Sequence, residues 1–356
     1  DHRIASARGT WHWAGAILLL VLHGGTLAWM GYRTAANQAE IGHMAAGVYA
    51  WNRQRFDVYC VNPPLVRALV TAPVALCRPR YDWSDYARPA HRRSEWRLGL
   101  AFCEANQEKA IRWYFPLARW TCLPFSLLGG YLCFRLATEI FGKACGLCAL
   151  VLWCFSPTML GWGATICPDV AAAAVGVAAV WGFRRWLLAP SGFRAFAAGL
   201  LLGLLPLTKL TWIVAYPLWP ALWLVWRFGQ CAAPRLRDQL CQLGAILLVA
   251  LYVTNVGYLF DGSFQMLGKY EFISNTLAGV DNADDNTPVV TGNRFAGTWL
   301  GRLPVPLPAD MVQGMDTQRY DFERGLPSYL QGRWADHGWW YYYLYALALK
   351  VPLGTW

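Results

Sequence analysis

Long apolar runs alternate with short polar connections through the first two thirds of the chain. A helix needs about 20 mostly apolar residues to cross a bilayer, and fewer when it is short or broken. Seven runs fit this pattern, at residues 11–30, 117–137, 145–161, 168–188, 195–210, 212–227 and 238–259. A further apolar run starts near residue 340 and covers 340–356. The pattern predicts an all-α polytopic membrane protein, a helical bundle cut off at the start of its eighth span.

The basic residues of the short connections fall on one side of these predicted spans. They are Arg135, Lys143, Arg184, Arg185, Arg194, Arg227, Arg235 and Arg237. Short cytoplasmic connections carry an excess of Lys and Arg, so this side is expected to face the cytoplasm. Residues 1–10 then form a cytoplasmic tail. Residues 31–116 (the first long loop) and 260–339 (the second long loop) are expected outside, as on a bacterial inner or plasma membrane.

The two long loops differ in pattern. In the first, AEIGHMAAGVYAWNRQ has apolar residues at helical spacing, and PPLVRALVTAPVAL opens with prolines, a common way to start a helix. We expect two short helices lying along the membrane surface. The second long loop is rich in Gly, Pro, Asp and Asn, which favour turns, and its Trp and Tyr content favours order.

Composition agrees with a membrane protein. Of the 356 residues, 56% are hydrophobic and only 15% are charged, against roughly a quarter charged in soluble domains. The net charge of +10 resides mostly in loops between apolar runs, which argues against nucleic acid as a partner. The 11 cysteines show no zinc spacing with matching His, and we interpret most as apolar packing. Cys60, Cys77 and Cys103 could supply one disulfide, with the pairing open. The acidic run at 281–286 lacks the calcium-loop spacing of an EF-hand and is interpreted as solvated.

A few charged residues lie within or beside the apolar runs, where charge is costly and usually functional. They are Glu40, His43, Asp169 and Lys209, and the predicted orientation places all of them at the outer water boundary. An active site at a membrane surface would require this arrangement.

Each acidic candidate has two interpretations. Glu40 could act as a general base, and His43, three residues later on the same helix face, could orient it or share a metal ion. Alternatively, both belong to a solvated helix start. Asp169 could be a functional acid or an acid that complements a helix N-terminus. Because Asp169 is the only acid between Glu139 and Asp238, the functional interpretation is favoured.

The basic candidates and His43 are predicted substrate contacts. Lys209 could hold a phosphate or extend to water from a helix end. Arg53, Arg55 and Arg67 flank VNPPL and could serve the same phosphate, at most one or two of them, the others being interfacial charge. Lys350 is a second candidate phosphate contact. No phosphate-binding GxxxxGK[ST] or GxGxxG follows a strand, so a lipid-embedded donor fits better than a soluble nucleotide.

Four segments resemble a known family when taken in order. They are AEIGHMAAGVYAWNRQRFDVYCVNPPLVRALVTAPVAL, FSPTMLGWGATICPDVAAAA, GLLLGLLPLTKLTWIVAYPL and LPSYLQGRWADHGWWYYYLYALALKVPLGTW. Together they resemble the GT-C class of polytopic glycosyltransferases, above all bacterial relatives of dolichyl-phosphate-mannose protein mannosyltransferases and the lipid A aminoarabinose transferase. The resemblance covers residues 12–356.

The resemblance implies an inverting transfer from a polyprenyl-phosphate sugar to a protein, lipid or glycan acceptor outside the cytoplasm. Glu40 and Asp169 match catalytic acids, and Lys209 matches a lysine thought to contact the lipid phosphate. Ala39 stands where the family often has the first Asp of an acidic pair, so Glu40 must substitute or the activity is altered. No soluble cofactor is implied, and dependence on a divalent metal stays open.

Two other functions fit the same pattern. A lipid-linked substrate transporter or flippase would also place polar residues at spans and loops, although no inverted repeat is visible. A non-catalytic membrane subunit that keeps the fold would explain Ala39.

Overall fold

The computed structural model describes residues 11–84, 86, 93–229, 235–282, 289–325, 327–336 and 338–351, and the chain is mostly helical. The expected cytoplasmic tail, most of the acidic run at 281–286 and residues 352–356 lie outside the described residues. Within the described part, three helices are long and apolar enough to cross a membrane: α2 (Trp11–Arg33), α9 (Asp169–Leu188) and α12 (Leu236–Val256). A helical membrane protein is expected to have such helices.

Several expected spans differ from single straight helices. The run at 145–161 is divided into α7 (Lys143–Phe155) and α8 (Pro157–Gly163), which bend by 55° and could form one broken span. The run at 117–137 lies within α6 (Phe115–Phe141), which is long but does not reach the apolar character of the three candidate spans.

The next two runs form helices of 17 and 14 residues, close to the 16 residues of each expected run. They are α10 (Gly192–Thr208) and α11 (Ala215–Phe228), the latter preceded by the 3-10 helix η3 (Leu210–Val214). At 1.5 Å per residue these helices extend only about 25 Å and about 21 Å, less than the roughly 30 Å of a bilayer core. By length and composition, the described residues contain three candidate spans, or four if α7 and α8 form one.

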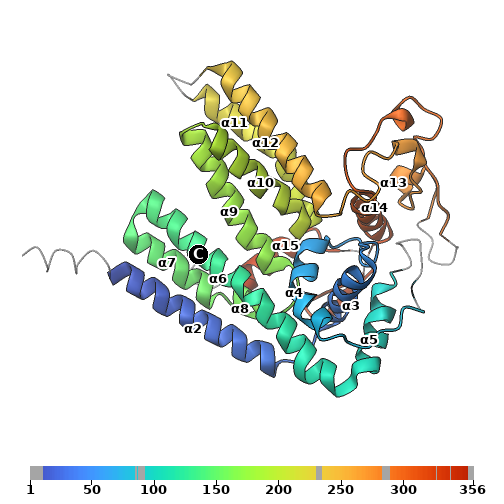
Figure 1. The fold of residues 1–356 in the computed structure, drawn as a ribbon, viewed down its shortest axis with the longest axis horizontal. Helices are drawn as coiled ribbons and strands as arrows, with labels where there is room; N and C mark the ends of the chain where they lie inside the picture. Colours follow the sequence, from blue (N-terminus) through green and yellow to red (C-terminus); the bar gives the residue numbers. More distant parts are fainter. Residues whose placement is uncertain are drawn as a thin grey trace, which may run out of the picture.

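The membrane-type helices form two layers that diverge from the region of α4 and α8 (Figure 1). One layer packs α2, α6 and α7 around Phe134, Leu150 and Trp153. The other packs α9, α10, α11 and α12 around a core that includes Trp186 and Trp219. Helix α6 also packs against α9, which joins the layers.

Small residues allow the closest helix crossing in the second layer. A Cβ atom placed on Gly203 of α10 would lie 2.6 Å from the backbone oxygen of Ala250 in α12, and one on Gly199 would lie 2.8 Å from the oxygen of Ile246. Such small-residue contacts let helix backbones approach where lipid supplies no hydrophobic driving force.

The first long loop contains the two expected helices and one that was not expected. The expected helices are α3 (Gln38–Arg53) and α4 (Pro64–Leu76), and they pack closely against each other. The additional helix is α5 (Glu95–Lys109), which continues through a π-helical turn, η2 (Ala110–Tyr114), into α6. Met44, Val70 and Phe102 are buried in one core that also contains Phe115 of α6 and Ala171 of α9, so these helices pack directly against the membrane-type helices.

The described part of the second long loop contains regular elements, in keeping with the order that its Trp and Tyr content favoured. It contains a 16-residue helix, α14 (Ala309–Arg324), together with η4 (Leu267–Lys269), α13 (Asn275–Ala278), η5 (Leu300–Arg302) and a hairpin of β1 (Ser328–Leu330) and β2 (Arg333–Ala335). The expectation of an all-α chain thus holds except for this short hairpin. The run expected to start an eighth span forms α15 (Tyr342–Lys350), a helix of 9 residues.

Replacing Gly203 with alanine is expected to lower the free energy of unfolding by about 1–3 kcal/mol, because the new methyl group would force α10 and α12 apart. Gly244→Ala is the matched control, since a Cβ at Gly244 of α12 meets no atom within 4 Å. Thermal unfolding in detergent measures both. Equal melting temperatures for the two variants would contradict the close crossing.

Candidate functional site

Two of the sequence candidates meet in the folded chain. The Nζ atom of Lys209 donates to the Oδ1 atom of Asp169 at 2.7 Å, although 40 residues separate them. Asp169 is the first residue of α9, and Lys209 directly follows α10 in an extended conformation. The two side chains are 40% and 42% exposed, so solvent and a ligand can reach the pair.

The local sequence explains where each side chain lies. An acid at the first turn of α9 complements the partial positive charge of a helix N-terminus. Lys209 ends α10 because its backbone leaves helical geometry, and its amide still donates to the oxygen of Leu205. Ion pairs this exposed stabilise a protein by about 0–1 kcal/mol, so the pair can open for a substrate at little cost.

Glu40 does not have the solvent-accessible environment that was expected of a general base. It is fully buried and forms a bidentate ion pair with Arg119 of α6, with N–O distances of 2.7 Å for both contacts. Its Oε1 also accepts from the amide of Ile166 at 3.2 Å, and its Oε2 accepts from the amide of Asn37 at 3.0 Å. An ionised carboxylate has about four lone-pair sites, and all are engaged here.

This geometry gives no support to Glu40 as a base, because no lone pair remains for an acceptor proton and water does not reach the carboxylate. Glu40 instead completes a capping box with Asn37 at the start of α3. Its contact with Ile166 supports the segment that leads, three residues later, to Asp169. We therefore assign Glu40 a positioning role.

Arg119 is the partner that the sequence interpretation missed. It is 1% exposed and also donates to the backbone oxygens of Gly31, Thr34 and Ala35, at the end of α2 and just after it. The signal was available, since Arg119 is a lone charge inside the apolar stretch FPLARWTCLPF. The criterion that selected Lys209 would have selected it too.

His43 is buried beside this ion pair and is not exposed to a ligand. Its ring lies 4.7 Å from that of Tyr59, and its Nδ1 has no hydrogen-bond partner among the described residues. Burial, together with the positive charge of Arg67, lowers the pKa of His43 to about 3. An imidazole enclosed in this way does not fit the predicted substrate contact.

The three candidate arginines of the first long loop are dispersed. Arg53 is exposed at the end of α3, and Arg55 pairs with Asp57 at 2.8 Å. Arg67 is 1% exposed and donates to the backbone oxygens of Tyr59 and Phe56. Burial makes Arg67 unfit for the predicted phosphate contact, and only the other two can reach a solvent-exposed ligand.

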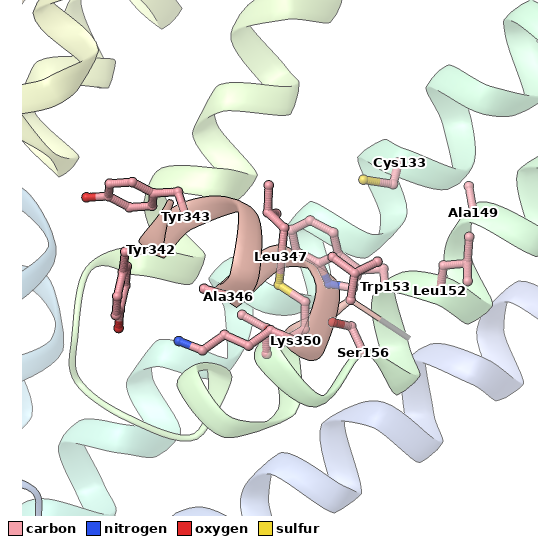
Figure 2. A pocket seen from close by; sticks show the side chains of 13 residues that line it. Cys133, Ala149, Leu152, Trp153, Ser156, Tyr342, Tyr343, Ala346, Leu347 and Lys350 are labelled. Carbon is pink, nitrogen blue, oxygen red and sulfur yellow. The ribbon is translucent and has the colours of Figure 1, made fainter. Parts of the chain in front are cut away.

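Lys350 lines an apolar groove of about 660 Å³ between α15 and helices α6, α7 and α8. Figure 2 shows the amine of Lys350 and the hydroxyl of Tyr342 toward one end of the groove, and Leu152 and Ala149 toward the other. The groove therefore combines an apolar body with polar groups at one end. Helix α8, which lines the groove, ends at Gly163, and α9 begins a few residues later at Asp169.

Metal binding by the candidate acids and His43 finds no geometric support. Across the part of the chain that the structure describes, no group of three or more His, Cys, Asp or Glu side chains could hold a metal ion. The three cysteines considered for a disulfide, Cys60, Cys77 and Cys103, are free.

Glu40→Gln is expected to destabilise the protein by about 3–5 kcal/mol, because it leaves the buried Arg119 without its counter-charge. Asp169→Asn removes the acid of a half-exposed pair and is expected to cost less than about 1 kcal/mol. Thermal and denaturant unfolding of the two purified variants provide the comparison. A Glu40→Gln protein as stable as wild type would contradict the positioning role.

Comparisons of the chain with protein-family models, curated proteins and solved structures returned no match.

Proposed function

We propose that this chain is a membrane glycosyltransferase of GT-C type, which transfers a sugar from a polyprenyl-phosphate donor to an acceptor outside the cytoplasm. The observation that carries the proposal is the Asp169–Lys209 pair. A carboxylate and an ammonium group lie 2.7 Å apart and are half exposed, and Leu210, next to Lys209, packs with Phe56 of the first long loop and Met311 of the second. Inverting transfer to a hydroxyl acceptor needs a base and a cation for the leaving phosphate, and this pair supplies both.

In the proposed reaction, the acceptor hydroxyl attacks the anomeric carbon of the donor from the face opposite the phosphate. A new glycosidic C–O bond forms, the bond from the anomeric carbon to the phosphate oxygen breaks, and the configuration inverts. Asp169 takes the acceptor proton, with the lysine contact on Oδ1 leaving Oδ2 to accept it. The lipid phosphate leaves with the bonding electrons.

Lys209 stabilises the leaving phosphate. An ammonium group has three N–H donors, and Asp169 takes one of them, so two remain for phosphate oxygens. A fixed charge beside a partly dry site acts strongly on charge that develops during reaction. The exposed Arg53 and Arg55 are further cations that the donor phosphate could approach.

The groove under α15 would hold the isoprenoid chain of the donor. Its lining of Leu152, Trp153, Leu347 and similar side chains suits a long hydrocarbon. The Lys350 amine at the polar end suits an anionic head group, in keeping with its predicted phosphate contact.

A second candidate function is a non-catalytic subunit that binds the same lipid-linked sugar. The burial of Glu40 favours it, because the acid expected to replace the missing Asp at Ala39 is fully occupied by Arg119. Donor binding without turnover, with transfer appearing in an Ala39→Asp variant, would support this candidate over the enzyme.

Transfer of label from radiolabelled polyprenyl-phosphate sugars to membrane extract is the decisive assay. Asp169→Asn and Lys209→Gln are each expected to slow transfer by about 100-fold or more, because general-base and electrostatic contributions are typically this large. Lys143→Gln is the matched control, since Lys143 is an exposed lysine at the start of α7, outside the site. Wild-type rates in both site variants would overturn the proposal.

Lys350→Gln is expected to raise the KM for the donor by about 10- to 100-fold and to leave kcat nearly unchanged, because a charge-assisted contact contributes about 1.5–3 kcal/mol to binding. Initial rates at varied donor concentration measure this. An unchanged KM would show that the groove does not bind the donor.

A further inference from the structure

Helix α14 of the second long loop docks onto the first long loop. A Cβ atom on its Gly314 would lie only 2.2 Å from the backbone oxygen of Cys60. Met311, one turn earlier, is fully buried and packs in a cluster with Leu210 and Tyr258. At the other end of the helix, Asp321 pairs with Arg93 at 2.8 Å. The two loops therefore meet along the whole of α14.

A group of buried polar atoms lies at the start of this contact. Asp310, in the first turn of α14, is 5% exposed, and its Oδ2 accepts no hydrogen bond from the described residues. The hydroxyl of Tyr258 and the Nε of Arg67 are also buried without a partner in the described structure. Arg67 gives its other N–H groups to backbone oxygens and forms no ion pair with any described carboxylate.

The charged side chains that act on Asp310 belong to the first long loop and to the segment after α12. Asp57 and Arg55 approach from the first long loop, Arg67 from α4 and Asp261 from the segment after α12. Burial first, and then the negative charges of Asp57 and Asp261, raise the pKa of Asp310 to about 7, against the opposing effect of the two arginines.

Two weakly acidic groups also face this cluster. Burial raises the pKa of the Cys60 thiol to about 12 and raises the pKa of the Tyr258 hydroxyl well above its usual range. Both groups therefore stay neutral at physiological pH. Asp310 is the member of the cluster whose charge can change near neutrality.

We propose that Asp310 is a proton-controlled latch, which holds α14 against the first long loop when its buried carboxyl is protonated and loosens this contact when the proton leaves to solvent. The geometry supports this because docking buries the carboxyl and gives Oδ2 no donor among the described residues. An ionised carboxylate in such a place is costly, whereas an undocked α14 would expose it to water.

The direction of the pH effect follows from the two states. Undocked, Asp310 has the ordinary Asp pKa of about 4, and docked it holds its proton to about pH 7. Docking is therefore most favourable at low pH. The ratio of docked to undocked protein falls by up to about tenfold per pH unit between about pH 4 and pH 7, and levels off above.

The latch has a consequence for Lys209. A Cβ on Gly314 would lie 3.3 Å from a methyl group of Leu210, the residue that follows Lys209. Undocking of α14 would release this support. The consequence for catalysis rests on the proposed glycosyltransferase function, whereas the docking equilibrium does not depend on it.

Hydrogen–deuterium exchange of the full chain in lipid nanodiscs from pH 5 to pH 8, corrected for intrinsic exchange rates, tests the latch. Protection of the α14 amides in wild type is expected to fall about 10- to 100-fold from pH 5 to pH 7 and then level off. The amides of α12 serve as the internal reference and are expected to show no such slope.

Asp310→Asn keeps the shape of the protonated acid and is expected to abolish the pH slope in α14. Asp336→Asn, a change of the same charge at an exposed position after β2, is expected to keep it. Flat protection in wild type would overturn the latch without any variant, and so would an unchanged slope in Asp310→Asn or a lost slope in Asp336→Asn. Because this readout needs no activity, an inactive protein with a pH-dependent α14 would refute the enzyme and keep the latch.

Discussion

The buried ion pair between Glu40 and Arg119 is the interaction on which the arrangement around the site depends. Arg119 binds carbonyl groups at the end of α2 and just after it, and Glu40 caps α3 and accepts from the amide of Ile166. Three stretches of the chain, residues 31–40, α6 and the segment before α9, thus converge on two side chains. Charges this deeply buried are tolerated only when each is paired and hydrogen-bonded, and here both conditions are met.

This pair accounts for the position of Asp169. The segment between α8 and α9 is short, and the amide of its Ile166 donates a hydrogen bond to the carboxylate of Glu40. The acid at the start of α9 therefore has a defined place, where Lys209 can meet it from the end of α10. A buried, fully bonded pair gives rigidity, and an exposed pair beside it remains free to exchange partners with a substrate.

The two long loops pack against each other and against the helices that carry the site. Their helices bury residues such as Met44, Phe102 and Met311, and they meet at α14. Burial at this joint alters the chemistry of ionisable groups, which keeps His43 neutral and brings the titration of Asp310 close to neutral pH. These properties come from what surrounds each group, since a histidine or an aspartate in water would titrate near its ordinary value.

The sequence by itself determined the helical membrane character, the two helices α3 and α4, and the candidate status of Asp169 and Lys209. These follow from local signals, namely apolar runs, proline-started helices and charge where charge is costly. Tertiary structure decided the rest. Glu40 and His43 looked like solvated candidates because burial is not a local property, and only the approach of α6 showed that Arg119 fills the bonds of Glu40. The bend between α7 and α8 and the extended backbone of Lys209 after α10 were likewise not apparent from the apolar runs alone. Helix α14 and Asp310 were hidden in a segment rich in turn residues, because a helix there is stabilised by its contacts with a distant loop more than by its own composition.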